Sequence, residues 1–301
     1  MPFMRHIADR MIRFPAFAGM PWKVAAWSFP VLLYACGESD EMLRLRQLAE
    51  TGNASAQHNL ALRLTRNEHG ERDYAQAIEW YRKAAAQGVP ESAFNLGTIF
   101  RTGAENIPGD EQQACHWFKQ AAQAGLPNGM FELALCLGRT EAAAAWLKRA
   151  SDAGVADATA ELGVRILYGS GVKQNVGEGL ALSRQAAEAG SSMGMHNYAV
   201  SLAEGIGGGK KDQRAAFEWF ERAVKAGSCT SYDPLADYYL RGEVVPKDEK
   251  KALELIYQGA AQGDKAALKS LARIFAQGEL GVTKDPAKAA SVRAMTPSCG
   301  L

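Results

Sequence analysis

The stretch "EGIGGGKKD" at residues 204–212 combines four glycines with two lysines, as phosphate-binding loops do. Such a loop cradles phosphate with backbone N–H groups, and a Ser or Thr after the lysine holds magnesium. Here Gly205 stands one residue too close to Gly209 and Lys210, and Lys211 occupies the hydroxyl position. The residues before the loop have helical rather than strand spacing. We therefore predict a connection between two helices, and we expect no nucleotide or other cofactor.

The histidines do not form a catalytic or metal-binding group. His58 and His196 stand at one position of the repeat described below, which Phe94, Phe131 and Lys269 also occupy. A position that accepts such different side chains is typical of packing or of a surface rim rather than of a base or ligand. The other two candidate ligands are His69 and His116, and neither has a second metal-binding side chain at helical spacing. The sequence predicts neither an active site nor a metal site.

The composition is that of a globular protein without a strong electrostatic preference. The chain has 301 residues, of which 47% are hydrophobic, and its formal net charge is +1. A balanced charge gives no indication of nucleic-acid binding. Five cysteines are too few for a disulfide scaffold in a chain of this length, and one of them must lack a partner.

The N-terminal segment resembles a secretion signal. Residues 24–35 form an apolar run that is too short to span a bilayer and that follows Lys23. The run ends in "LYAC", which resembles a bacterial lipobox, and the chain then becomes acidic. We predict a lipoprotein signal over residues 1–35 and lipidation of Cys36. The alternatives are a buried helix over residues 24–35, and a start at Met20 instead of Met1.

The rest of the chain is a repeat, which appears as similar segments that each end in glycine, such as "AIEWYRKAAAQG" and "AFEWFERAVKAG". The intervals between these glycines are 36, 37, 29, 36, 37 and 36 residues. The glycines are Gly52, Gly88, Gly125, Gly154, Gly190, Gly227 and Gly263. A fixed period of this length indicates a stacked array.

Each unit is predicted to be a pair of helices, with the glycine as the left-handed C-cap of the second helix. A leucine column eight residues after the glycine marks the buried face of the first helix: Leu60, Leu96, Leu133, Leu162, Leu235 and Leu271. A tryptophan column eight residues before the glycine is predicted to be the core of the second: Trp80, Trp117, Trp146 and Trp219. The expected N-caps of the second helices are Asp73, Asp110, Asp212, Asp248 and Asp285. The 29-residue third unit lacks the loop between its helices, which leaves Thr140 as its N-cap.

These features resemble a known family. The Leu-Gly pairs at residues 96–97 and 162–163, the Gly-x-Gly-Val at 169–172 and the Lys-Ala-Ala followed by Gly at 83–88 are similar to Sel-1-like repeats, relatives of the tetratricopeptide repeat. The resemblance covers residues 40 to about 294. It implies an all-α, right-handed αα-superhelical solenoid of about seven repeats, at residues 49–88, 89–125, 126–154, 155–190, 191–227, 228–263 and 264–295.

An array of this kind offers a curved surface, which suits a protein partner. We expect a non-catalytic interaction scaffold, anchored in the bacterial envelope and facing the periplasm. The resemblance suggests an immunity protein against a secreted toxin, or an adaptor in an envelope complex. The alternatives are a cytoplasmic signalling adaptor and a β-lactam hydrolase, an activity connected with family members that carry a cysteine pair in every repeat, as this chain does not. Neither nucleic acid nor a small-molecule substrate is expected.

One stripe of the first helices is the candidate binding surface. Positions seven, eleven and fourteen after the glycine share a face roughly 100° from the leucine column. The stripe contains Asn59, Arg63, Arg66, Asn95, Glu132, Glu161, Arg165 and Asn197. Repeated polar side chains along a groove suit an extended peptide or a protein surface, although any solvated helix face shows a similar pattern.

Cys115 and Cys136 stand ten residues before and eleven after the turn at Gly125. If the helices that flank this turn are antiparallel, both cysteines lie about 15 Å from it and could be bridged. However, the position of Cys115 is filled by ordinary core residues in other units, and the position of Cys136 by Arg63, Arg165 and Tyr238. We therefore expect two buried thiols, with the disulfide as the alternative.

Fatty-acid labelling tests the predicted anchor. A fatty-acid analogue is expected to label the wild-type chain and not the Cys36→Ala variant, because the thiol of Cys36 starts the modification. Mass spectrometry of the mature protein should find residues 1–35 removed. An unmodified full-length chain would contradict the signal and place residues 24–35 in the fold.

Overall fold

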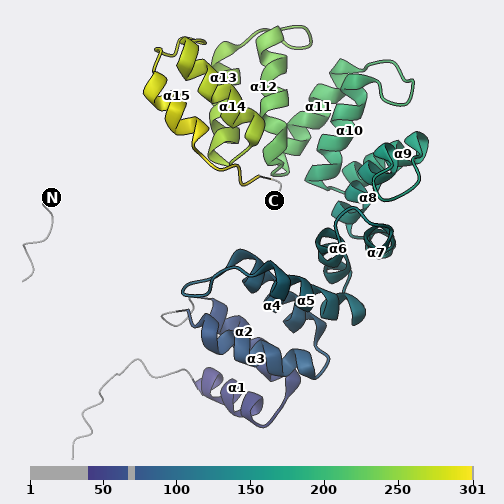
Figure 1. The fold of residues 1–301 in the computed structure, drawn as a ribbon, viewed down its shortest axis with the longest axis vertical. Helices are drawn as coiled ribbons and strands as arrows, with labels where there is room; N and C mark the ends of the chain where they lie inside the picture. The colour runs from purple at the N-terminus through teal and green to yellow at the C-terminus, as the bar shows by residue number, and fades with distance from the viewer. Residues whose placement is uncertain (1–39, 67–71, 300–301) are drawn as a thin grey trace, which may run out of the picture. The chain divides into compact units, whose positions relative to one another are not determined.

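The computed structural model describes residues 40–66 and 72–299, and these residues are helical with short connections (Figure 1). Residues 1–35, Cys36 and His69, on which several predictions fall, lie outside the described residues. Within the described part of the chain, no helix has both the length and the apolar character needed to cross a membrane.

The described residues form a starting helix, α1 (Asp40–Glu50), followed by seven helix pairs. The first helices of the pairs are α2 (Ala54–Thr65), α4 (Pro90–Thr102), α6 (Pro127–Cys136), α8 (Ala156–Tyr168), α10 (Ser192–Glu204), α12 (Tyr232–Arg241) and α14 (Lys265–Gln277). The second helices are α3 (Tyr74–Ala86), α5 (Glu111–Gln123), α7 (Glu141–Asp152), α9 (Val176–Glu188), α11 (Gln213–Lys225), α13 (Glu249–Ala261) and α15 (Pro286–Arg293). A short 3₁₀ turn, η1 (Cys229–Ser231), precedes α12.

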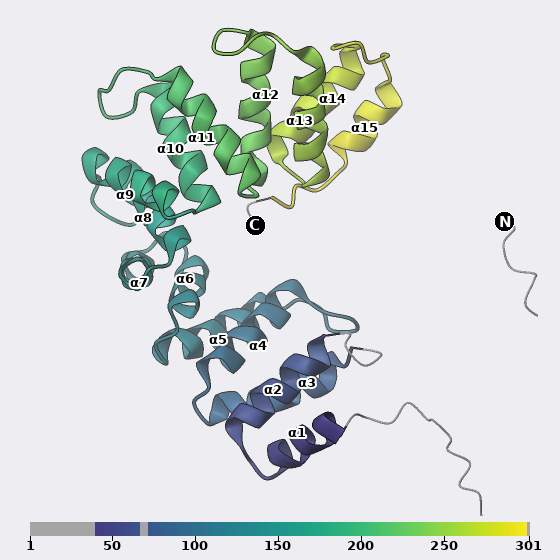
Figure 2. The ribbon, with the colours of Figure 1, turned by 180° about the vertical axis from the view of Figure 1, so that it is seen from behind.

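Each helix packs on the helices before and after it in the chain, and α8 also packs directly on α10 (Figures 1 and 2). The core is accordingly a series of clusters that join neighbouring units. The leucine column is confirmed, because all six leucines are buried. The predicted all-α solenoid is therefore correct. The stretch at residues 204–212 connects α10 to α11, as expected.

The capping signals act as the sequence predicted. The side chains of Asp73, Asp110, Asp212, Asp248 and Asp285 each accept a hydrogen bond from a backbone N–H in the first turn of the helix that follows. Thr140 does the same for α7 in the short third unit. The seven repeat glycines have φ between +78° and +93°. At six of them an added Cβ would meet no other atom within 4 Å, so steric crowding does not explain the glycine. Glycine is required at these positions because the backbone is left-handed.

Close approach requires a different glycine within the first helix. A Cβ added to Gly97 of α4 would lie 2.6 Å from two ring carbons of Phe118 of α5. The Phe118 ring is 1% exposed and has no room to move away. The same position of the fourth unit, Gly163, faces the backbone of α9. The Leu-Gly pair therefore combines a core side chain with the contact that lets the two helices of a unit approach.

The prediction for the tryptophan column is wrong by one residue. All four tryptophans are only partly buried. A cationic side chain lies over three of the rings. Lys83 Nζ is 3.9 Å from the centre of the Trp80 ring, and the guanidinium groups of Arg149 and Arg222 lie similarly over Trp146 and Trp219. The following residue is the core residue in each case: Tyr81, Phe118, Leu147 and Phe220, which are at most 3% exposed. Adjacent residues differ by 100° on a helix, so the tryptophan lies at the edge of the buried face.

Substitutions at three consecutive positions of α5 test this assignment. Phe118→Ala is expected to lower the free energy of unfolding by about 3 to 5 kcal/mol, because it leaves a cavity against Gly97. Trp117→Ala should cost clearly less, and Lys119→Ala should be close to neutral because Lys119 is exposed. Urea unfolding followed by circular dichroism measures all three. A loss for Trp117→Ala equal to that for Phe118→Ala would contradict the assignment.

Candidate protein-binding surface

The predicted stripe lies on the first helices α2, α4, α6, α8 and α10, and its residues differ in exposure. Asn59 of α2 and Arg66, the residue after α2, are exposed, whereas Asn95, Glu132 and Asn197 are half-buried. Asn95 Nδ2 donates to the Tyr81 hydroxyl at 3.1 Å, which fixes its amide against α3. The stripe is thus most exposed at its α2 end and half-buried along the later first helices.

Ion pairs hold part of the stripe in place. The Arg63 guanidinium pairs with Glu41 of α1, and the Glu132 carboxylate pairs with Arg101 of α4. Arg101 is not in the predicted stripe. It also pairs with Glu111 at 3.2 Å, and its guanidinium lies 4.5 Å from the centre of the Phe118 ring. Sequence reasoning missed Arg101 because no other unit has an arginine at this position to form a column.

Arg165 is not available to a partner. Its side chain is buried, with the residue 4% exposed, and its Nε donates to Glu161 at 2.7 Å. Its Nη1 donates to the carbonyl oxygen of Gly138 at 2.6 Å. Gly138 lies in the turn that replaces the missing loop of the third unit. Arg165 therefore joins this turn to α8, and the expectation of a solvated side chain at this position is wrong.

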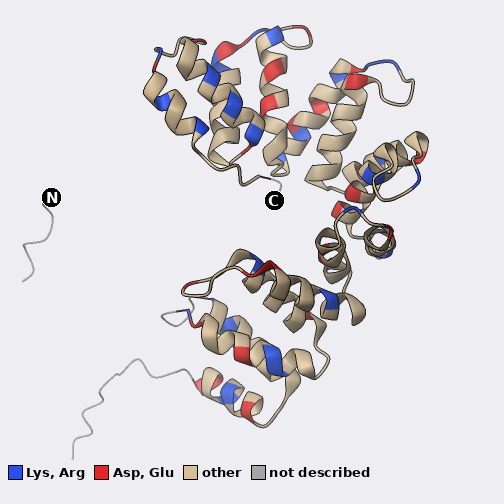
Figure 3. Cartoon of the chain, viewed as in Figure 1, with Lys and Arg blue, Asp and Glu red and all other residues tan. Residues whose placement is uncertain are grey.

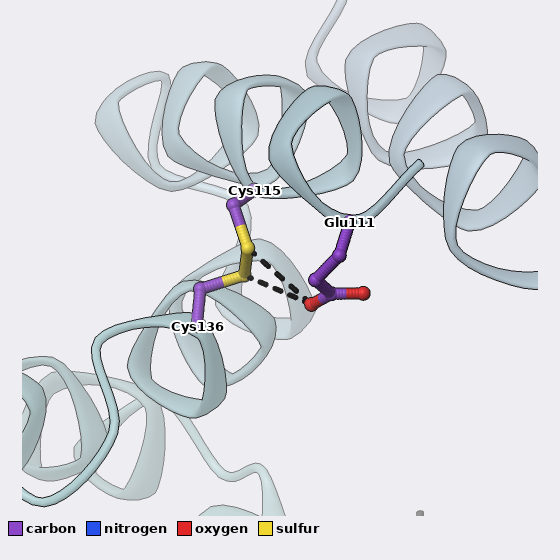
Figure 4. Close-up of side chains that lie close together, drawn as sticks. All are labelled: Glu111, Cys115 and Cys136. Atoms are coloured by element: carbon purple, nitrogen blue, oxygen red, sulfur yellow. Dashed lines mark hydrogen bonds between the residues drawn. A yellow bond between two sulfur atoms is a disulfide. The ribbon is translucent and has the colours of Figure 1, made fainter. Parts of the chain in front are cut away.

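The two cysteines that flank the Gly125 turn are bonded (Figure 4). Cys115 of α5 and Cys136 of α6 have Cα atoms 5.7 Å apart. The expectation of two free thiols is therefore wrong, and the geometric argument for level cysteines on antiparallel helices is right. Cys136 is the last residue of α6, and its side chain faces α5.

Glu111 lies beside this disulfide, with its Oε1 3.4 Å from Cys115 Sγ and 3.8 Å from Cys136 Sγ (Figure 4). These three side chains have the spacing of metal ligands. A disulfide sulfur has neither a proton to donate nor the thiolate charge that binds a metal. In the bonded state the cluster is consequently a structural contact, and Glu111 instead pairs with Arg101.

A second disulfide joins Cys229 of η1 to Cys299, across 70 residues of the chain. The backbone N–H groups of Ser298 and Cys299 both donate to the carbonyl oxygen of Gly263. The segment after α15 is thereby fastened to the turn between α13 and α14. Sequence reasoning missed this pair because Cys299 lies beyond the last repeat, where the period gives no register.

The two core histidines each face a serine of the next unit. His58 Nδ1 lies 2.8 Å from Ser92 Oγ, and His196 Nδ1 lies 2.9 Å from Ser231 Oγ. This distance suits a base and a nucleophile, but both serines are 0% exposed and cannot reach a substrate. The pairs are therefore contacts between units, in agreement with the packing role expected for this position.

Burial determines the protonation of these histidines. It lowers the pKa of His196 to about 4, so the imidazole is neutral in the folded protein near neutral pH. Burial also lowers the pKa of His58, and the Glu91 carboxylate partly offsets this effect.

A groove of about 650 Å³ crosses the turns between units three, four and five. Its lining consists mainly of small residues around Gly154 and Gly190, with Asp157 and Ser191 among its polar groups. Ser191 Oγ donates to Asp157 Oδ1 at 2.6 Å and also caps α10. These two side chains therefore already bond each other and the backbone.

The sequence matches the Sel1 repeat at residues 54–89, 90–126, 127–155, 156–191, 192–228, 235–264 and 266–291. With most of the chain matched, the protein belongs to the Sel1 repeat family, a family of protein-interaction modules. The resemblance expected from the Leu-Gly and Gly-x-Gly-Val motifs is confirmed.

A solved structure from the same family supports the fold. A Sel1 repeat protein from Oxalobacter formigenes superposes with a TM-score of 0.62 at 28% identity, covering 83% of this chain and 74% of its own. An uncharacterized protein from Neisseria meningitidis is 28% identical over 281 residues, which cover 93% of this chain and 50% of that protein. The chain thus spans about half the length of this curated relative. Immunity protein PA5088 from Pseudomonas aeruginosa is 22% identical over 69% of this chain and 82% of its own, with a TM-score of 0.48, too low to support a conclusion about role.

The pKa of His196 predicts a loss of stability in mild acid. The unfolded state takes up a proton near pH 6.5 and the folded state only near pH 4, so stability present above pH 6.5 is lost as the pH falls. Between pH 7 and pH 5 this group should lower the free energy of unfolding by about 2 kcal/mol. Urea unfolding at the two pH values measures it. His196→Phe, the residue that two other units carry here, should remove this part of the pH dependence, and an unchanged pH dependence would contradict the assignment.

Proposed function

We propose that the protein is a non-catalytic scaffold on the outer side of the cytoplasmic membrane, where it binds one protein partner along the first-helix stripe. The observation that carries the proposal is the repetition of polar side chains at one position of five successive first helices: Asn59, Asn95, Glu132, Glu161 and Asn197. Equivalent groups at regular intervals can pair with an extended partner at several places, so that modest contacts add up.

The rigidity of the stripe supports a binding role. Asn95 and Glu132 are held by Tyr81 and Arg101, and such restraint reduces the conformational entropy lost when a partner binds. Asn59 and Arg66 remain exposed at one end of the stripe. The stripe thus contains both half-buried side chains with fixed partners and side chains that are exposed.

The two disulfides support the proposed compartment. Cysteine pairs persist in oxidising environments such as the periplasm and are rare in the cytosol. With Cys115 bonded to Cys136 and Cys229 bonded to Cys299, Cys36 is the remaining cysteine of the five. A cysteine left over from the two pairs agrees with the proposed lipidation of Cys36 in the "LYAC" sequence, and the disulfides favour the envelope over a cytoplasmic signalling role.

Two roles follow from stoichiometric binding in the envelope: immunity against a secreted toxin, and assembly of an envelope complex. An enzymatic toxin would lose its activity when the scaffold covers its active site. A partner in an envelope complex would keep its activity but would no longer assemble correctly when the scaffold is absent.

Affinity capture with matched variants tests the binding surface. Asn59→Ala/Asn95→Ala/Asn197→Ala should reduce recovery of the partner from envelope extracts at least tenfold, because three contacts along the stripe are lost. The control, Lys119→Ala/Gln185→Ala/Lys225→Ala, changes three exposed residues of second helices and should leave recovery unchanged. Equal recovery by both triple variants would place the partner elsewhere. Enzyme assays on the captured partner then distinguish immunity from assembly.

Thiol counting tests the compartment. Protein isolated from its native cells and denatured without reductant should show no free thiol at Cys115, Cys136, Cys229 or Cys299. Peptide mapping should recover the pairs 115–136 and 229–299. Four free thiols would contradict the proposed location outside the cytoplasm.

A further inference from the structure

The disulfide between Cys115 and Cys136 lies beside two opposite charges. Nη2 of Arg101 lies 3.4 Å from Cys136 Sγ, and Oε1 of Glu111 lies 3.4 Å from Cys115 Sγ. Both cysteines are half-buried, so the bond is partly open to solvent. The two sulfurs of one accessible bond therefore have different electrostatic surroundings.

These charges make the two sulfurs unequal in the same direction. A guanidinium beside a sulfur stabilises its thiolate, whereas a carboxylate beside a sulfur opposes the thiolate. Glu111 Oε1 is also farther from Cys136 Sγ, at 3.8 Å, than from Cys115 Sγ. A negative charge is thus more stable on Cys136. In thiol–disulfide exchange the sulfur with the lower thiol pKa leaves faster, which makes Cys136 the leaving group.

Neighbouring side chains hold Arg101 in place. Its guanidinium lies 4.5 Å from the centre of the Phe118 ring and pairs with the carboxylates of Glu111 and Glu132. The Arg101 side chain is only 27% exposed, so salt and water screen its charge less than that of a fully exposed arginine. Acidic and basic residues are interspersed over the described helices, and no large region of one sign outweighs these local charges (Figure 3).

The stacking of the units does not explain a cation at this place. The other units carry uncharged residues at the position of Arg101: Thr65, Gly138, Leu167, Ala203, Leu240 and Ala276. The second disulfide also lacks such a neighbour. Among residues 40–66 and 72–299, no charged side chain forms a hydrogen bond with a sulfur of Cys229 or Cys299. The chain thus contains one disulfide with charged neighbours and a second one that serves as an internal reference.

We propose that the bond between Cys115 and Cys136 is a thiol–disulfide exchange site for a dithiol, with Arg101 stabilising the leaving sulfur. One thiolate of the dithiol attacks Cys115 Sγ, the S–S bond breaks, and its electron pair leaves on Cys136 Sγ. The second thiol of the donor loses its proton to solvent and attacks the donor sulfur that is bonded to Cys115. Cys115 is released and takes up a proton, and the donor becomes a disulfide that has given two electrons to the protein.

The bonded form is the resting state of this site in an oxidising compartment. The exchange takes place at the sulfurs and does not require a partner on the first-helix stripe.

Reduction of the folded full chain by dithiothreitol at pH 7 tests the proposal, with the thiols released at each pair counted by alkylation and peptide mass spectrometry. Arg101→Gln should slow the reduction of the 115–136 pair at least tenfold and leave that of the 229–299 pair unchanged. Arg101→Lys keeps the positive charge and should stay within about threefold of the wild type. Glu111→Gln should accelerate the reaction, because the carboxylate no longer repels the incoming thiolate. Melting temperatures by circular dichroism check that the variants fold.

The direction of these effects separates the proposal from a structural role of Arg101. If Arg101 only held α4, α5 and α6 together, its loss would loosen their contact and speed up the reduction. An unchanged or faster reaction in Arg101→Gln would therefore overturn the proposal.

A second measurement on the wild type does not depend on any variant. After reduction, brief treatment with iodoacetamide at pH 7 should alkylate Cys136 at least tenfold faster than Cys115, because the thiolate is the reactive form. Equal alkylation of the two cysteines would also overturn the proposal.

Discussion

A pair of 13-residue helices cannot bury its apolar face by itself, and the whole structure follows from that constraint. The leucine of the first helix and the bulky residue of the second must be covered by the next pair. Small residues allow the close approach that this covering requires, as Gly97 does against Phe118. Every unit therefore depends on its neighbours, and the core runs through the array as linked clusters rather than as one centre.

The same dependence explains why polar groups occur at the contacts between units. His58 and His196 reach buried serines of the following unit, and Arg165 reaches the carbonyl oxygen of Gly138. Buried polar groups need partners, and a contact between units supplies a partner whose position is fixed. The disulfide between Cys115 and Cys136 serves the boundary of the short third unit in the same way. These groups hold the units in register, so a chemical interpretation of histidines beside serines is unnecessary.

Function in such an array belongs to the surfaces that stacking leaves uncovered. Along the first helices these are the polar groups beside the leucine column. Amides and paired charges on the stripe suit hydrogen bonds with a protein surface.

The sequence by itself determined the repeat, the helix pairs, their caps and the family, because each of these depends on residues close together in the chain. Asp110 caps the helix that starts one residue later, and Gly125 ends that helix, whatever lies around it. Only the tertiary structure decided which aromatic residue faces the core. Trp117 and Phe118 point in directions 100° apart on one helix, and the positions of the neighbouring helices determine which of the two is buried. It also decided that Arg165 is buried, that Arg101 joins Glu111 and Glu132, and that Cys299 reaches Cys229. Apart from the pair of Arg101 and Glu111, which joins the two helices of one unit, these contacts reach beyond a single unit, and the repeat period does not specify how the units are rotated relative to one another.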